Sequence, residues 1–110
     1  MKLIYASASP FVRKVHIVLL ETGLIEEVSL VEVTTTPVNT ADQAVAANPT
    51  GKIPALILED GSSVYDSRVI CRYLNDRAKA DLYPTDTIWK MLTLEATADA
   101  IMEAAVLMTY

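Results

Sequence analysis

Apolar and polar residues follow one another along the chain in two kinds of pattern, and each pattern predicts one kind of element. Short runs that favour strands occupy residues 2–6, 27–33, 54–60 and 63–66. Longer runs with helical spacing or helix-end signals occupy residues 10–22, 41–47, 67–79 and 88–110. Asp60 and Gly61 mark a hairpin turn between the last two strands. This order predicts an α/β fold, with helices on both faces of a mixed four-stranded sheet and a long helix after it.

Two of the predicted helices carry an apolar face for the core. In the helix that starts at Pro10 and stops at Gly23, this face consists of Val12, Val15 and Leu19. In the helix at 67–79 it consists of Val69, Ile70, Tyr73 and Leu74. Cys71 lies beside the second face, which favours a small core residue over a functional thiol.

The last predicted helix carries an apolar seam along its whole length. Its members are three or four residues apart: Met91, Leu94, Ala98, Ile101, Ala105 and Met108. After Lys90 there is no Gly, Pro or basic residue to mark a helix end, so we expect a chain cut within or just after the first helix of a helical domain. We expect self-association of residues 88–110 through this seam; the alternative is that the helix folds back on its own sheet.

Composition and charge narrow the class of protein. The 110 residues are 52% hydrophobic, which suits one domain or one domain with part of another. A net charge of −5 without a basic cluster disfavours nucleic acid and anionic membranes as partners. The single cysteine excludes an internal disulfide and fits a reducing cytoplasm. We expect neither a signal peptide nor a membrane span, and no metal site.

The stretch YASASPFVRK, residues 5–14, raises three possibilities: a helix cap, a serine hydrolase site and a CxxC redox centre. The sequence disfavours the second and third. Ser9 before Pro10 is a good helix cap. A serine hydrolase needs a base within reach, and His16 lies seven residues along the same helix, roughly 10 Å away at 1.5 Å per residue. A CxxC redox centre lacks both cysteines. Beside the cap, one chemistry remains: a hydroxyl and free backbone N–H groups at a helix start can stabilise the anion of another molecule.

Two further motifs have structural and functional interpretations. GKIP is not a phosphate-binding P-loop, because Ile53 stands where Ser or Thr is needed. In the structural interpretation, Pro54 at the entrance of a strand is a trans turn proline that marks a sheet edge. In YDSR, Ser67 can act as N-cap with Asp66 favoured near the positive helix end, and Arg68 is expected in solvent.

Taken together, SPFVRK, NPTGKIPAL and YDSRVICRYL, in that order, resemble the thioredoxin-like N-terminal domain of bacterial glutathione transferases. LYPTDTIWKMLTLEATADAIMEAAVL resembles the linker and first C-terminal helix of that family. The resemblance implies a glutathione-binding domain at 1–80, a linker at 81–87, and at 88–110 the first helix of a truncated helical domain.

The resemblance also implies roles for single residues. Ser9 matches the residue whose hydroxyl faces the glutathione thiolate, with Ser7 second and Tyr5 third. The implied glutathione-binding residues are Phe11, Lys52, Ile53, Pro54, Asp66 and Ser67.

Within this set each residue has its own implied contact. The main chain of Ile53 pairs with the cysteinyl backbone, and Pro54 is cis. Lys52 reaches the glycyl carboxylate or is simply solvated. Asp66 binds the ammonium of the γ-glutamyl group, and Ser67 binds the α-carboxylate of the same group.

The implied activity is attack by the glutathione thiolate on an electrophilic small molecule, as in detoxification, by a cytoplasmic homo-oligomer such as a dimer. Glutathione is then the co-substrate, and no metal is used. Two alternatives stay open: a non-catalytic glutathione-binding or protein-interaction module, and a glutathione-dependent isomerase or dehalogenase.

Overall fold

The computed structural model describes residues 1–36 and 39–109, so Tyr110, at the end of the helix predicted at 88–110, lies outside the described residues. The strands are β1 (Lys2–Tyr5), β2 (Ser29–Glu32), β3 (Ala55–Ile57) and β4 (Ser63–Val64). The α-helices are α1 (Pro10–Thr22), α2 (Asp42–Ala47), α3 (Ser67–Ala78) and α4 (Ile88–Thr109). Two 3₁₀ turns, η1 (Ile25–Glu27) and η2 (Thr85–Thr87), complete the order.

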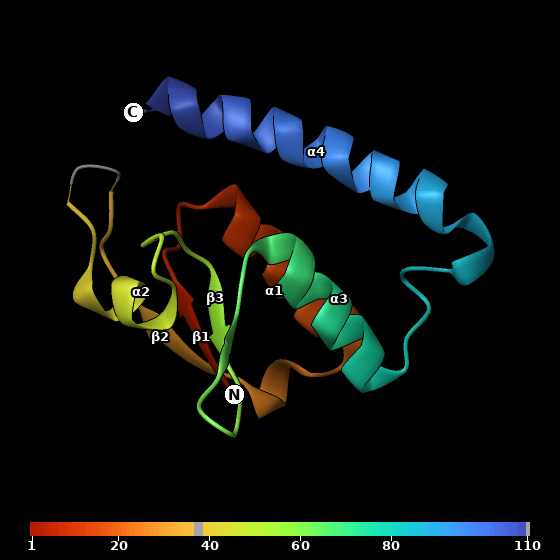
Figure 1. The fold of residues 1–110 in the computed structure, drawn as a ribbon, viewed down its shortest axis with the longest axis horizontal. Helices are drawn as coiled ribbons and strands as arrows, with labels where there is room; N and C mark the ends of the chain where they lie inside the picture. The colour runs from red at the N-terminus through yellow and green to blue at the C-terminus, as the bar shows by residue number, and fades with distance from the viewer. Residues whose placement is uncertain (37–38, 110) are drawn as a thin grey trace.

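The strands form one mixed sheet in the order β2-β1-β3-β4. β1 runs parallel to β2 and antiparallel to β3, which is itself antiparallel to β4. α1 and α3 pack side by side on one face and α2 lies on the other (Figure 1). Successive residues of the central strands therefore serve two cores, with Leu3 and Leu56 under α1 and α3, and Ile4 and Ala55 in the core that includes Ala47 of α2. The predicted sheet with helices on both faces is confirmed.

The first strand–helix unit follows its sequence signals closely. Ser9 is the N-cap of α1, where its Oγ accepts a hydrogen bond from the Val12 N–H at 3.3 Å, and Pro10 follows as the first helical residue. Gly23 ends the helix at φ 72°, a left-handed conformation that glycine adopts without steric cost. The predicted apolar face is buried.

The start of α3 differs from the prediction. Asp66, and not Ser67, is the N-cap, because its carboxylate accepts a hydrogen bond from the Arg68 N–H. Ser67 is then the first helical residue and is 2% exposed. The buried stripe runs through Ser67, Ile70, Cys71 and Leu74, spaced three and four apart, which leaves Val69 outside it and 48% exposed.

Some strands are shorter than predicted. The strand expected at 27–33 forms only at Ser29–Glu32, because residues Ile25–Glu27 make the 3₁₀ turn η1 before it. The hairpin forms around Gly61 as expected, although its two strands are also shorter than the predicted 54–60 and 63–66. The short helix predicted at 41–47 is α2.

The long helix α4 lies beside α1 (Figure 1). Among its residues of described burial, the buried polar ones are Glu95 and Asp99, at 7% and 4% exposed, and both form ion pairs with Lys14 of α1. Most of the predicted seam is exposed, with Leu94, Ile101 and Met108 at 60%, 67% and 88%. The helix therefore does not fold back over its own sheet through this seam. None of the described helices is both long and apolar enough to span a membrane.

The position of Cys71 generates the first prediction. Its thiol is fully buried, and burial raises its pKa to about 12, against the opposing effect of the Lys14 ammonium. Near pH 8 only about one thiol in ten thousand is then ionised. We expect the native protein to resist a chromogenic disulfide reagent for many minutes, and the protein in denaturant to react at once. Rapid labelling of the native state would contradict the buried position.

Candidate functional site

The sheet topology brings three loops to one edge. β1 ends at Tyr5, and the register that pairs Ile4 with Ala55 places the start of β3 beside that end. β4 is antiparallel to β3, so its C-terminal end meets the same edge. The segments that follow β1, precede β3 and follow β4 therefore lie together there, and α1 and α3 both begin in this region.

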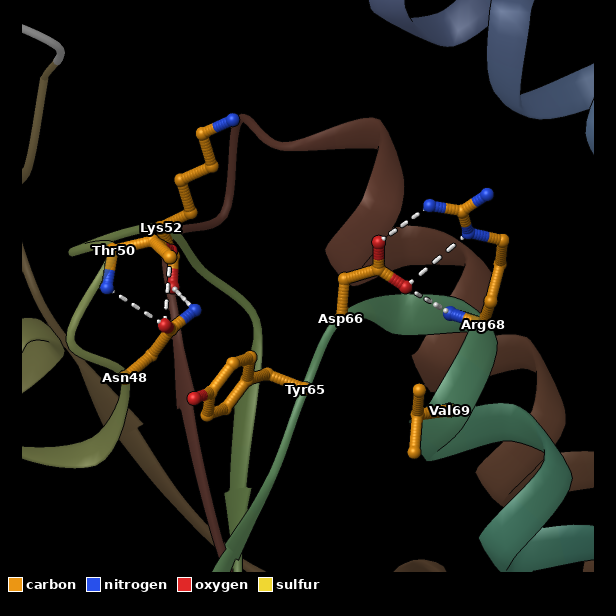
Figure 2. A pocket seen from close by; sticks show the side chains of 7 residues that line it. All are labelled: Asn48, Thr50, Lys52, Tyr65, Asp66, Arg68 and Val69. Carbon is orange, nitrogen blue, oxygen red and sulfur yellow. Dashed lines mark hydrogen bonds and ion pairs between the residues drawn. The ribbon is translucent and has the colours of Figure 1, made fainter.

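A cavity of about 420 Å³ opens at this edge (Figure 2). The described residues that line it come from the loop before β3 and from the junction of β4 with α3: Asn48, Thr50, Lys52, Tyr65, Asp66, Arg68 and Val69. Of the residues predicted from the sequence, Lys52 and Asp66 are thus brought together in one cavity.

Asn48 shapes the loop before β3, a role that was not predicted from the sequence. Its side chain is 2% exposed; the amide donates to the Lys52 carbonyl oxygen at 3.1 Å, and its oxygen accepts from the N–H and the hydroxyl of Thr50, each at 2.9 Å. Gly51 approaches Thr40 so closely that a Cβ would lie 2.5 Å from the Thr40 Cγ2. The turn-forming NPTG run was the only sequence signal for this loop.

The loop leads into the segment predicted to receive a peptide ligand. The Ile53–Pro54 peptide bond is cis, as predicted. Pro54 is buried and Ile53 is half-buried against the smaller of the two cores. Lys52 is exposed and lines the cavity, and its side chain extends upward from the loop in the view of Figure 2.

Asp66 supplies the carboxylate of the cavity, and Arg68 binds it. Arg68 donates to it through Nη2 at 2.9 Å, through Nε at 3.4 Å and through its backbone N–H at 3.0 Å (Figure 2). The hydrogen bonds from the Arg68 side chain lower the pKa of Asp66, outweighing partial burial, so the carboxylate is ionised at neutral pH. Arg68 was expected in solvent, and its side chain is indeed 57% exposed, but it is ion-paired.

The predicted hydroxyls lie at the same edge but are not among the described residues that line the cavity. Ser9 is half-buried at the start of α1, followed by the half-buried Phe11, and Ser7 is exposed. The Tyr5 hydroxyl donates to Glu32 on the edge strand β2, at 3.3 Å. Ser67 is buried directly after Asp66.

The chemistry available at this edge is the binding of a small zwitterion or anion. It offers an ionised carboxylate, a solvated ammonium and the N-termini of two helices, which favour negative charge. Within the described part of the chain, no group of three or more His, Cys, Asp or Glu side chains is placed to hold a metal ion.

The sequence of this chain matches one known protein family. Residues 8–77 match the model of the glutathione S-transferase N-terminal domain. The chain is 40% identical over 108 residues to the uncharacterized GST-like protein YibF of Escherichia coli, covering 94% of this chain and 51% of YibF. The chain thus spans about half the length of this relative.

Solved structures agree with the family match. A glutathione transferase family member from Pseudomonas fluorescens with bound glutathione superposes with a TM-score of 0.92 at 45% identity, over 96% of this chain and 53% of that one. A glutathione S-transferase from Methylobacterium radiotolerans in complex with glutathione sulfonate superposes at 0.81 and 36% identity, over 96% and 50%. The mixed sheet with its flanking helices is accordingly the thioredoxin-like fold of these proteins, and the chain belongs to the glutathione S-transferase family.

Proposed function

We propose that this chain binds glutathione in the cavity beside Asp66 and forms the thiol-activating part of a glutathione transferase. The observation that carries the proposal is the convergence of the Ile53–Pro54 segment, the ionised Asp66 and two helix N-termini at one sheet edge. Structures of relatives that contain glutathione or its derivatives support the choice of ligand. In this proposal residues 1–80 are the glutathione-binding domain, 81–87 a linker, and 88–110 the first helix of a helical domain.

In the proposed complex each part of glutathione meets a group of matching chemistry. Asp66 accepts from the γ-glutamyl ammonium, while the Ser67 hydroxyl and N–H donate to the α-carboxylate at the positive end of α3. The main chain of Ile53 pairs with the cysteinyl backbone as a short strand addition. Lys52 faces the glycyl carboxylate, and Phe11 lies next to the thiol end.

Ser9 is our choice for stabilising the thiolate, ahead of Ser7. Its Oγ already accepts from the Val12 N–H, which leaves the O–H free to donate outward. Lowering a thiol pKa of about 8.5 by about two units requires roughly 2.7 kcal/mol. A hydrogen bond to a charged group supplies about 1.5–3 kcal/mol and the helix dipole about 0.3–1 kcal/mol. Tyr5 is the weaker alternative, because its hydroxyl donates to Glu32.

The proposed reaction is attack of the bound thiolate on an electrophilic small molecule, a detoxification chemistry suited to a reducing cytoplasm. Isomerisation or dehalogenation uses the same thiolate, and a substrate panel on the longest available protein distinguishes them. A non-catalytic binding module is the other alternative. Conjugation of glutathione to a chromogenic electrophile at pH 7 tests the proposal: binding without turnover would favour the module, and no binding would refute the proposed function.

Replacement of Ser9 tests the proposed thiolate contact. We expect Ser9→Ala to raise the pKa of bound glutathione by about one unit or more and to leave affinity almost unchanged, because the thiolate is the only part of glutathione that the hydroxyl contacts in the proposed complex. A pH titration of thiolate absorbance measures this shift. Ser7→Ala is the matched control, and a shift in the control alone would transfer the role to Ser7.

Replacement of the two residues at the start of α3 tests the γ-glutamyl contacts. We expect Asp66→Ala and Ser67→Ala each to weaken glutathione binding about tenfold or more, because a hydrogen bond to a charged group contributes about 1.5–3 kcal/mol. Asp66→Ala also removes the N-cap, so its melting temperature falls as well. Calorimetric titration and thermal melts separate the two effects; unchanged affinity with a lower melting temperature would mean that Asp66 is only a cap.

The surface of α4 leads us to propose a second copy of this chain as a partner. The exposed surface is 6946 Å², whereas a compact monomer of this length exposes about 6,000 Å². The excess is close to the roughly 800 Å² that each partner buries in a standard interface. The surface is apolar where α4 is exposed, at Leu94, Ile101 and Met108, and a groove of about 580 Å³ runs between α4 and α1.

We expect the 110-residue chain to sediment as a dimer or larger species at micromolar concentration, without a major monomer. Deleting residues 91–110, or introducing Ile101→Glu, should shift it towards monomer, because a charge in a buried interface is costly. Val45→Glu is the control, since Val45 is 47% exposed on α2 and away from α4. A soluble monomer with α4 fully helical would contradict the proposal.

A further inference from the structure

Tyr65 lines the cavity from the end of β4 and has no part in the contacts proposed above. The preceding Val64 packs against the core beneath α1 and α3, so in an extended chain the next side chain lies on the other side. Figure 2 shows the Tyr65 ring extending from the chain before Asp66 towards the loop of Asn48, with its hydroxyl on the loop side. Tyr65 is 37% exposed, so a ligand in the cavity can reach it.

The hydroxyl of Tyr65 differs from those of the other described tyrosines in its hydrogen bonding. Each of those hydroxyls has a protein partner: Glu32 for Tyr5, Arg77 for Tyr73 and Glu95 for Tyr83. Within the part of the chain that the structure describes, the Tyr65 hydroxyl makes no hydrogen bond, although polar side chains line its cavity. A phenol can both donate and accept, so this hydroxyl is available to a ligand.

The polar side chains of the neighbouring loop are used within the loop itself. Thr50 donates to Asn48 through its N–H and its hydroxyl, and Asn48 donates to the Lys52 carbonyl oxygen. The Lys52 ammonium forms no ion pair with any described residue. Lys52 and Tyr65 therefore both keep donors for a ligand at the loop end of the cavity, whereas Asp66 supplies an acceptor at the other end.

The two donors differ in how precisely they can hold an anion. Lys52 is exposed, and its ammonium is a point charge on a flexible stem whose attraction water screens. The Tyr65 side chain has fewer rotatable bonds, and its O–H donates along one direction to an ionised oxygen. A carboxylate at the loop end would thus gain charge compensation from Lys52 and a directed hydrogen bond from Tyr65.

We propose that Tyr65 is a specificity-determining residue whose hydroxyl donates to the C-terminal carboxylate of the bound tripeptide, beside the Lys52 ammonium. The inference rests on the proposed function, in which glutathione extends through the cavity from Asp66 to Lys52. It names the ligand class more closely: γ-glutamyl tripeptides that end in a free carboxylate, in preference to those that end in an amide or ester. A neutral amide oxygen is the weaker acceptor, because hydrogen bonds to ionised groups are stronger.

The experiment compares S-methylglutathione with the corresponding glycinamide, which has a neutral amide in place of the glycyl carboxylate. Calorimetric Kd values for the 110-residue chain yield a discrimination ratio, the Kd of the glycinamide divided by that of S-methylglutathione. We expect Tyr65→Phe to lower this ratio about fivefold, a modest effect for a hydrogen bond to a charged group because the ring is partly exposed. The ring is retained and the hydroxyl has no described protein partner, so the melting temperature should stay unchanged.

Two further variants separate the Tyr65 hydroxyl from other causes. Tyr73→Phe removes the hydroxyl that Arg77 contacts on α3, outside the cavity, and should leave the ratio unchanged. Lys52→Met should also lower the ratio, but about 0.5 M salt should diminish the effect of Lys52 more than that of Tyr65, because the phenol is neutral.

The outcomes that would overturn the inference are distinct from those that would refute the proposed function. A ratio near one in the unmodified chain, an unchanged ratio in Tyr65→Phe, or an equal decrease in Tyr73→Phe would overturn the inference. An equal loss of affinity for both peptides in Tyr65→Phe would do the same, because the hydroxyl would then not distinguish their C-termini. Failure of the unmodified chain to bind S-methylglutathione would instead refute the proposed function.

Discussion

The pairing of β1 with β3 is the interaction on which the site depends. These strands are the two central ones of the sheet, and their residues are buried on both sides, Leu3 and Leu56 beneath α1 and α3, Ile4 and Ala55 on the opposite face. Because the pairing is antiparallel, the end of β1 meets the start of β3. A slip of one residue would exchange the two faces of β3 and shift its preceding loop relative to the end of β1.

A second constraint lies between α1 and α4, where charged groups are buried. Lys14 bridges Glu95 and Asp99, whose side chains are only 5% and 6% exposed. Removing such charges from water costs free energy that their mutual attraction and hydrogen bonds must offset, so the geometry of the pairs is restrictive. The pairs hold α4 in one rotation about its axis, which leaves the apolar seam with Leu94 and Ile101 exposed. The alignment of α4 and the exposure of its apolar seam thus have the same cause.

Helix capping and the proposed ligand binding use the same groups at the edge of the sheet. Ser9 and Asp66 each satisfy a backbone N–H at a helix start, and each keeps further hydrogen-bonding capacity for another molecule. Stability and the proposed binding are therefore coupled at these residues, and only ligand-specific measurements can separate the two.

The sequence by itself determined which segments become helices and strands and where the first helix begins and ends. Pro10 and Gly23 act locally, through backbone conformation, so α1 was predictable residue by residue. The order of motifs also identified the family and the cis proline before β3. These features need only neighbouring residues or a comparison of short motifs.

Only the tertiary structure decided how distant side chains meet. Asn48 reads as a turn residue, and its role in holding the loop appears only when the chain closes around it. Periodicity placed Val69 on the buried face of α3, whereas the structure buries Ser67 there. In α4 it identified the apolar seam, but it did not indicate that the acidic Glu95 and Asp99 would be buried. Lys14 lies 85 residues from Asp99 along the chain. A hydrophobic pattern predicts burial from the polarity of neighbouring residues. A buried carboxylate is instead stabilised by a charged partner that lies far away in the sequence, so the local pattern cannot predict it.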